Sequence, residues 1–474
     1  MVTPFPLVLI GLPIMAAALA YLLRRLEAVA ALLAALVAAL LAGAVAAWPS
    51  VGLVITPVLT IPLGAPWTAG EQRFALEAAA RPALVFLFGA AALAFLGAAV
   101  IPQGRAFAPG GLLVLSGFAA TLLVHPLFMA PATLAATAAI AVFFAQGGRI
   151  GPTRGALRQM LFPFLAFPFF LLAAWYMAQA PLNPDDPAPL QTAGRLFAWG
   201  FFFLLGAAPL HGAMPALLDE SPPLAGFLLI LGSNTVVLNL LLRFPLAYPW
   251  LAQQVEAGTW LRTLGLWTAI WGGAAAVGQR DFGRLLGYAA VHDYGAILLG
   301  LSLQGPLGAA TMLTMLLARS LSLLMGASAL SILRERMGDD SFARLRGAAA
   351  RLPGATAGVL LGGLGLVGWP LTAGFGARWS LLVLLLEEKE TLIVGLFALS
   401  AAGVALGYVR GWAALLGRIP PEQALTTPVE REPARATLWM GLLLLIAILM
   451  ALAPQVIAPW VGRALNALTG AVTP

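Results

Sequence analysis

Long apolar runs recur from one end of this sequence to the other, and they limit the folds open to the chain. A helix needs about 20 mostly apolar residues to cross the core of a bilayer. Fourteen stretches fit that template, and they lie near residues 4–23, 28–48, 82–101, 108–124, 128–146, 159–179, 194–218, 223–243, 260–279, 284–303, 306–332, 352–386, 391–415 and 436–460. We therefore predict an all-α polytopic membrane protein with about 14 transmembrane helices. The first run has no basic leader before it, so we expect a retained helix there and not a signal peptide.

The composition agrees with this class and excludes several others. Apolar residues make up 61% of the 474 positions and charged residues 9%, whereas soluble domains carry about 25% charged residues. The sequence has no cysteine, so disulfides and thiolate metal sites are excluded. Its three histidines fall on separate runs, and we predict neither a metal site nor a cofactor in this chain. The excess of 26 basic over 19 acidic residues is spread over short loops, which argues against nucleic-acid binding.

The arginines predict how the helices are oriented. Most of them follow the odd-numbered runs, as Arg24, Arg25 and Arg154 do. Basic loops stay on the cytoplasmic side of a membrane. We therefore predict a multi-pass protein of the inner (cytoplasmic) membrane with both termini on the outer side. The outer loop at residues 51–70 alternates β-branched and small residues, and we expect it to form a hairpin that could contact a neighbouring subunit.

Two of the runs are expected to be broken helices. The run near 194–218 contains Pro209 and Pro215, and the run near 352–386 contains Pro370 and Gly374 among further glycines. Proline removes a backbone donor and glycine lowers the cost of bending. Non-helical backbone at membrane depth survives only inside protein or beside water.

The positions of these breaks suggest an internal repeat. Each broken run is the fourth member of a five-helix block, and an odd block size inverts the second block relative to the first. Two unrelated kinked helices are the alternative. The repeat predicts four segments: residues 1–107 with the first three helices and an outer loop, 108–244 as the first repeat, 245–417 as the second, inverted repeat, and 418–474 as a linker and the last helix.

Three motifs resemble those of a known family. The segment "PLHGAMPALLDESPPLAG" resembles Pro-Phe-His-x-Trp-Leu-Pro-Asp-Ala-x-x-x-Ala-Pro-Thr of the antiporter-like membrane subunits of respiratory complex I and their relatives in cation/proton antiporters and membrane-bound hydrogenases. The register matches His211, Pro215, Glu220 and Pro222. Further along, "RDFGRLLGYAAVHDYGAILLGL" and "GWPLTAGFGARWSLL" resemble two more motifs of that family, in the same order. Together the three motifs, the fourteen runs and the two breaks cover most of the chain.

The resemblance implies a path for protons and a set of partners. In that family each half carries a glutamate on its second helix and a lysine on its broken helix. Lysines or histidines link the halves along the membrane midplane, and redox chemistry in a separate peripheral arm drives the protons. The partners implied are other membrane-arm subunits, lipids and, indirectly, that arm.

This sequence departs from the family at the residues that carry protons. Its single lysine, Lys389, lies in a loop. The family's lysine on the first broken helix falls at Leu204, the lysine of the following helix near Asn234 or Thr235, and the glutamate near Pro131. Hydrocarbon cannot exchange a proton, and charges persist in a membrane only where function or pairing keeps them. We therefore expect the first-half path to be disabled.

Six residues remain as candidates for a proton path: His211, Glu220, His292, Asp293, Arg319 and Arg378. Arg378 stands where the family has its terminal lysine, but an arginine is a poor proton relay. Alternatives stay open for the others. Either histidine could be a buried, hydrogen-bonded side chain, and Asp293 could form an ion pair with Arg319 that neutralises both. Asp219 and Glu220 could be acids at the start of the next helix, with Ser221 as its cap and Pro222 and Pro223 as its first residues.

These observations predict a membrane-arm subunit of a complex-I-like NADH (or ferredoxin):quinone oxidoreductase that performs no catalytic chemistry itself. It contributes to proton translocation or, given its lost lysines and glutamate, serves as a structural and coupling subunit. Within the same class, a conducting subunit could use a rearranged path through His211, His292, Asp293 and Arg378. The alternatives outside it are a stand-alone cation/proton antiporter and a membrane subunit of an inorganic-carbon-uptake or hydrogenase module.

Overall fold

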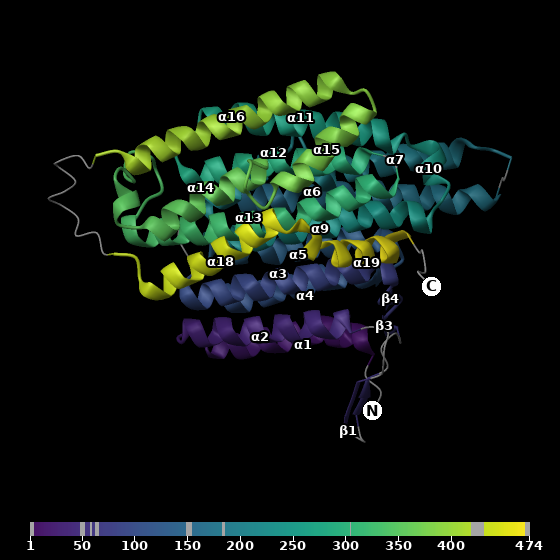
Figure 1. Ribbon diagram of the computed structural model, residues 1–474. Coiled ribbons are helices and arrows are strands. Elements are labelled where there is room, and N and C mark those ends of the chain that lie inside the picture. Colours follow the sequence, from purple (N-terminus) through teal and green to yellow (C-terminus); the bar gives the residue numbers. More distant parts are fainter. Residues whose placement is uncertain are drawn as a thin grey trace. The chain divides into compact units, whose positions relative to one another are not determined.

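The chain is helical over most of its length (Figure 1). The computed structural model describes residues 4–47, 53–56, 59–61, 66–147, 154–182, 185–303, 305–418 and 431–469. Within these ranges, ten helices are long and apolar enough to cross a membrane, and α4 (Phe107–Leu123) and α14 (Pro353–Val367) are shorter apolar helices. The all-α polytopic membrane fold is therefore confirmed, whereas the count of fourteen helices and the inverted repeat stay predictions.

The chain forms two compact units, which we describe separately. Unit 1 comprises Met1–Gly206, Leu228–Glu256 and Asn466–Pro474, and unit 2 comprises Ala207–Phe227 and Ala257–Leu465. The helices that lie mainly in unit 1 are α1 (Phe5–Leu22), α2 (Glu27–Ala46), α3 (Arg81–Val100), α4, α5 (Ala130–Gln146), α6 (Arg154–Gln179), α7 (Ala188–Leu205), α9 (Pro223–Ala247) and α10 (Leu251–Gln254). Those that lie mainly in unit 2 are α8 (Ala213–Glu220), α11 (Ala257–Val277), α12 (Phe282–Ser302), α13 (Pro306–Met337), α14, α15 (Phe375–Glu387), α16 (Thr391–Leu416), α18 (Ala434–Leu452) and α19 (Ala458–Thr469).

The core of unit 2 is built around α12 and α13. α12 packs against α8, α11 and α13, and α13 also packs against α14. Within the most apolar 18-residue window of each of these two helices, 89% of the residues are buried. A helix buried on all sides is expected to be apolar on all sides. Asp293 on α12 and Arg319 on α13 are nevertheless charged and buried, so they must be held by partners inside the unit.

Both predicted helix breaks are present. α7 ends at Leu205 and α8 begins at Ala213, while α14 ends at Val367 and α15 begins at Phe375. Pro209 and Pro370 lie inside these gaps, and Gly374 immediately precedes α15. Pro215, in contrast, lies in the first turn of α8, where its missing N–H costs little.

Short strands pair outside the helices of unit 1. β1 (Leu53–Thr56) and β2 (Leu59–Ile61) form an antiparallel pair, which confirms the hairpin expected in residues 51–70. β3 (Trp67–Ala69), β4 (Gln72–Phe74) and β5 (Val124–His125) form a second antiparallel sheet. In that sheet Arg73 is paired with His125.

Gly363 is a close contact point between two helices of unit 2. It lies on α14 against the ring of Tyr408 on α16, and Tyr408 is 1% exposed. A Cβ added at Gly363 would overlap that ring. We expect Gly363→Ala to lower the free energy of unfolding by about 1–3 kcal/mol, the usual cost of overpacking. Thermal unfolding in detergent measures this. Gly441→Ala on α18 is the control, because its Cβ would meet nothing within 4 Å. Equal unfolding temperatures for the two variants would contradict the prediction.

Candidate functional site

Three buried charged side chains meet inside unit 2. Asp293 comes from α12, Arg319 from α13 and Arg378 from α15, and they are 3%, 1% and 4% exposed. Asp293 Oδ2 accepts a hydrogen bond from Arg319 Nη1 at 2.5 Å, and Asp293 Oδ1 accepts one from Arg378 Nη2. The Asp293–Arg319 pair considered from the sequence is thus present, and Arg378 joins it. We call these three residues the Asp293 cluster.

The two arginines also bind backbone carbonyls. Arg319 Nη1 donates to Ala290 O and Arg378 Nη2 donates to Leu366 O, each at 2.8 Å. Leu366 lies in the last turn of α14, where carbonyls lack a partner within the helix. Arg378 therefore satisfies a carbonyl on the far side of the break that separates α14 from α15.

The remaining terminal nitrogens of the cluster contact sulfur. Arg319 Nη2 lies 3.7 Å from Met214 Sδ, and Arg378 Nη1 lies 3.7 Å from Met315 Sδ. A thioether is a weak acceptor with no charge. Two guanidinium groups and one carboxylate therefore leave a net charge of +1 in the cluster.

This arrangement is unsuited to passing a proton. A guanidinium group does not release its proton in proteins. Each Asp293 oxygen is occupied by an arginine. The cluster has the chemistry of a structural clamp between α12, α13 and α15.

His292 precedes Asp293 on α12 but belongs to a different set of contacts. Its Nδ1 lies 2.9 Å from Ser400 Oγ on α16, and Ser400 Oγ donates its hydrogen to Ala269 O at 2.5 Å. His292 Nδ1 also lies 3.3 Å from Ala269 O, the same carbonyl. Within the described part of the chain, Nε2 has no hydrogen-bond partner. This geometry fits the buried, hydrogen-bonded histidine considered from the sequence.

An aromatic ring lies between His292 and the cluster. Phe397 on α16 stacks on His292 with ring centroids 4.8 Å apart. The guanidinium carbon of Arg378 lies 5.7 Å from the centroid of the same ring. Sequence reasoning did not single out Phe397 or Ser400, because neither residue type signals a contact partner by itself.

His211 lies in the gap between α7 and α8. Its ring stacks against Trp271 on α11 with centroids 5.9 Å apart, and Tyr288 on α12 is the other aromatic neighbour at 6.4 Å. Among the described residues its Nδ1 has no hydrogen-bond partner. The structure thus places His211 in an aromatic environment and not on the Asp293 cluster.

Unit 1 carries no titratable side chain at the positions where the family has its lysines and glutamate. Leu204 is 6% exposed and lines a cavity of about 20 Å³ together with Gln159, Ser233 and apolar side chains. Gln159 Nε2 donates to Ser233 Oγ at 2.9 Å. A cavity needs about 10–15 Å³ to hold one water. The space beside Leu204 therefore admits about one water molecule and not a chain of them.

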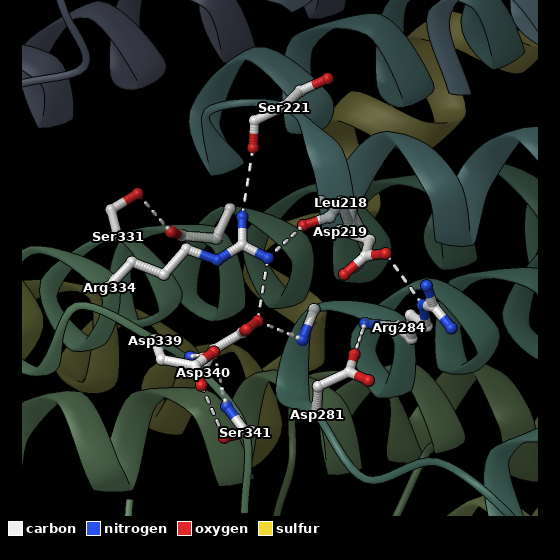
Figure 2. Close-up of polar contacts among 12 residues, drawn as sticks. Leu218, Asp219, Ser221, Asp281, Arg284, Ser331, Arg334, Asp339, Asp340 and Ser341 are labelled. Atoms are coloured by element: carbon white, nitrogen blue, oxygen red, sulfur yellow. Dashed lines mark hydrogen bonds and ion pairs between the residues drawn. The ribbon is translucent and has the colours of Figure 1, made fainter. Parts of the chain in front are cut away.

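Asp219, in the segment "PLHGAMPALLDESPPLAG", belongs to a polar network at one end of unit 2, shown in Figure 2. Asp219 and Glu220 are the last two residues of α8, and Asp219 Oδ2 accepts from Arg284 Nε at 2.8 Å. This corrects the interpretation that places Asp219 and Glu220 at the start of the next helix, because they end α8. The reason is that Pro222 and Pro223 cannot continue α8, so the helix ends just before them.

Arg334 on α13 is the central donor of this network. It donates to the carbonyls of Leu218 at 2.9 Å and Ser221 at 3.2 Å, at the end of α8 (Figure 2). Its Nη2 also binds Asp340 Oδ2 at 2.8 Å, and the same oxygen accepts from Gly283 N at 2.9 Å. The network therefore fixes the end of α8 to the start of α12 and the end of α13.

A second ion cluster lies in unit 1 beside the three-stranded sheet. Arg243, which is 2% exposed, donates from Nη2 to Glu77 Oε2 at 2.8 Å and from Nη1 to Leu122 O at 2.7 Å. His125 Nε2 lies 3.2 Å from Glu77 Oε1. Sequence reasoning missed this cluster, since its members are spread over a loop, a two-residue strand and a helix end.

His125 should make stability depend on pH. Burial lowers the pKa of His125 from 6.5, Arg243 and Arg73 act in the same direction, and Glu77 opposes them. Below pH 6.5 the unfolded chain therefore binds more protons than the folded one, so this residue's contribution to stability is lost as pH falls. We expect His125→Gln to reduce the loss of stability on acidification, with little change at alkaline pH. Thermal unfolding in detergent across this pH range is the measurement, and identical pH profiles would refute the assignment.

The described residues contain no group of three or more His, Cys, Asp or Glu side chains placed to hold a metal ion.

Part of this chain resembles a known family of membrane proteins. Residues 188–403 match the family described as "NADH:quinone oxidoreductase/Mrp antiporter, TM". The chain is 26% identical over 272 residues to NADH-quinone oxidoreductase subunit N 3 of Streptomyces griseus subsp. griseus. That match covers 57% of this chain and 48% of the relative, so the chain spans about half the length of this relative.

Solved structures share the fold over nearly the whole chain. A chain of the membrane-bound sulfane sulfur reductase, an archaeal respiratory membrane complex, aligns with a TM-score of 0.77 at 16% identity, covering 98% of this chain and 97% of that one. A chain of respiratory complex I from Thermus thermophilus aligns with a TM-score of 0.75 at 20% identity, covering 99% and 100%. Residues 188–403 thus resemble the family described as "NADH:quinone oxidoreductase/Mrp antiporter, TM", and the chain as a whole shares its fold with chains of these two respiratory complexes.

Proposed function

We propose that this chain is a membrane-arm subunit of a complex-I-like NADH (or ferredoxin):quinone oxidoreductase that couples neighbouring subunits structurally and does not conduct protons along its own axis. The observation that carries the proposal is the Asp293 cluster. Asp293 is bonded to two arginines, and neither arginine can act as a proton relay. A carboxylate held in this way joins helices and does not exchange protons.

Unit 1 supports the same conclusion. A proton relay needs titratable groups or water within hydrogen-bond reach of one another. Leu204 and Pro131 offer neither, and the cavity beside Leu204 has room for about one water. We propose that both units keep the fold of a proton carrier without a continuous path.

The location and partners follow from the fold and the arginine distribution. We propose the inner membrane with both termini outside, as the basic loops indicate. The partners are other membrane-arm subunits and lipids, with a peripheral redox arm acting indirectly. Mild detergent solubilisation followed by mass spectrometry tests this. Iron–sulfur and quinone-site subunits are expected to co-purify with the chain, and their absence would favour a stand-alone antiporter.

Proton stoichiometry tests the non-conducting role. In native membranes the number of protons moved per electron is expected to be the same with the wild-type chain and with Arg378→Gln. The variant keeps a neutral Asp293–Arg319 pair, so the complex should assemble, which a native gel can check. Arg463→Gln on α19, an exposed residue, is the charge-matched control. A lower stoichiometry with Arg378→Gln alone, in an assembled complex, would show that this subunit conducts.

A further inference from the structure

One end of unit 2 exposes four arginines that no function above uses. We call Arg280, Arg344, Arg346 and Arg410 the basic patch, and all four are exposed. Arg280 follows the end of α11, and its carbonyl accepts a hydrogen bond from Phe342 N at 2.8 Å. The backbone N–H of Arg344 donates to Ser341 O at 3.1 Å. The segment that carries Arg344 and Arg346 is thereby held against Arg280.

The end of α16 packs against the same segment. Gly347 N donates to Ala414 O at 3.4 Å, and Arg410 Nη1 donates to Val277 O in the last turn of α11. The patch is therefore assembled from three stretches of chain that the fold ties together. Its arginines are not scattered along one flexible loop.

The basic patch keeps most of its positive charge. Among the described residues, no acidic side chain lies within ion-pair distance of its four arginines. Asp340 is bonded to Arg334, and Asp281 Oδ1 accepts from Arg284 N at 2.9 Å. Asp339 interacts electrostatically with Arg344, and its Oδ2 accepts a hydrogen bond from Ser341 Oγ at 2.7 Å. Three acids engaged with other groups leave the patch free to attract an anion.

An exposed apolar stripe on α16 runs up to the basic patch. Its members are Leu399, Leu406, Val409, Trp412 and Leu416, with exposed fractions between 49% and 71%. Their spacing of seven, three, three and four residues places them on one face of the helix. Tryptophan is enriched at membrane interfaces, where Trp412 would lie next to Arg410. A phospholipid has two matching parts: its apolar acyl chains match the stripe, and its phosphate matches the arginines.

We propose that the basic patch and this stripe form a binding site for an anionic phospholipid. Its phosphate would be held by the guanidinium groups, which bind phosphate through paired hydrogen bonds, and its acyl chains would lie along α16. Zwitterionic lipids carry no net charge and would be retained less well. The patch lies in the loops and at the helix end that the arginine distribution assigns to the cytoplasmic side, where basic clusters attract anionic lipids. This inference needs only the membrane fold and is independent of the proposed non-conducting role.

Lipid retention by the purified full chain tests the proposal. The protein is equilibrated in mixed micelles of phosphatidylglycerol and phosphatidylcholine, and bound lipids are counted by native mass spectrometry. In the variant R280Q/R344Q/R346Q, the affinity for phosphatidylglycerol is expected to fall by about fivefold for each arginine removed. This is the factor that corresponds to about 1 kcal/mol. Phosphatidylcholine should be unaffected.

The matched control is R24Q/R25Q/R105Q, which removes the same charge from exposed arginines of unit 1. It should retain phosphatidylglycerol like the wild type. Equal losses in both variants would mean that bulk charge, and not this site, attracts the lipid, and would overturn the proposal. Unchanged lipid retention together with loss of a co-purifying subunit in R280Q/R344Q/R346Q would assign the patch to an acidic protein partner and also overturn it. A thermal unfolding scan of both variants confirms that each is folded.

Discussion

Replacing Asp293 by asparagine is expected to lower the free energy of unfolding by about 3–5 kcal/mol, the usual cost of leaving buried charges without their partner. Asp293 is bonded to both Arg319 and Arg378, and all three side chains are almost fully buried. The variant would leave two guanidinium groups facing a neutral amide. Thermal or denaturant unfolding in detergent gives the measurement, with the yield of folded protein as a second readout.

Two further variants make this prediction specific. Asp219→Asn is the same chemical change at a pair whose arginine, Arg284, is 55% exposed, and it should cost about 0–1 kcal/mol. Arg319→Met should cost less than Asp293→Asn, because it leaves a neutral pair between Asp293 and Arg378. A larger loss of stability for Arg319→Met than for Asp293→Asn would contradict the net charge of +1 that we assign to the cluster.

The second large effect is expected at Leu204 in unit 1, where an apolar side chain stands at the position of the lysine in the family that the sequence resembles. Leu204→Lys places an ammonium group beside a cavity lined almost entirely by apolar side chains. An unpaired buried charge should lower the free energy of unfolding by about 3–5 kcal/mol. Leu134, on α5, lines the same cavity, and Leu134→Glu alone should be similarly destabilising.

A double-mutant cycle shows whether these losses come from charge. The double variant Leu204→Lys with Leu134→Glu should recover about 0.5–3 kcal/mol of the summed cost, because the two side chains can pair. Leu204→Met keeps the volume and should cost less than about 1.5 kcal/mol. Wild-type stability of Leu204→Lys would show that water and polar groups reach this position, contrary to a closed first half.

The architecture could be predicted from the sequence because its signals are local. Apolar run length marks helices, and Pro209 and Pro370 mark the breaks without any knowledge of neighbours. Charges in apolar runs must be paired, which made an Asp293–Arg319 contact a reasonable expectation. That Arg378 shares the same carboxylate depends on how α12, α13 and α15 pack, and residue spacing does not contain this information.

The missed contacts have the same origin. Ser400 and Phe397 are neighbours of the His292 ring, yet both lie on α16, more than 100 residues away. Glu77, His125 and Arg243 come from three separate elements and meet only in the folded unit. For Asp219 and Glu220, the local pattern is compatible both with the start of the next helix and with the end of α8, because the two prolines fit either position.

The hydrogen bond from Arg378 to Leu366 O has a mechanical consequence. A break between two half-helices usually provides a hinge, but this one is bridged by a side chain that also binds Asp293. A displacement of α15 would pull on the end of α14 through Leu366 and on α12 through the carboxylate. We expect these half-helices to move together as a stiff body, so that the break between α14 and α15 does not serve as a hinge in this unit.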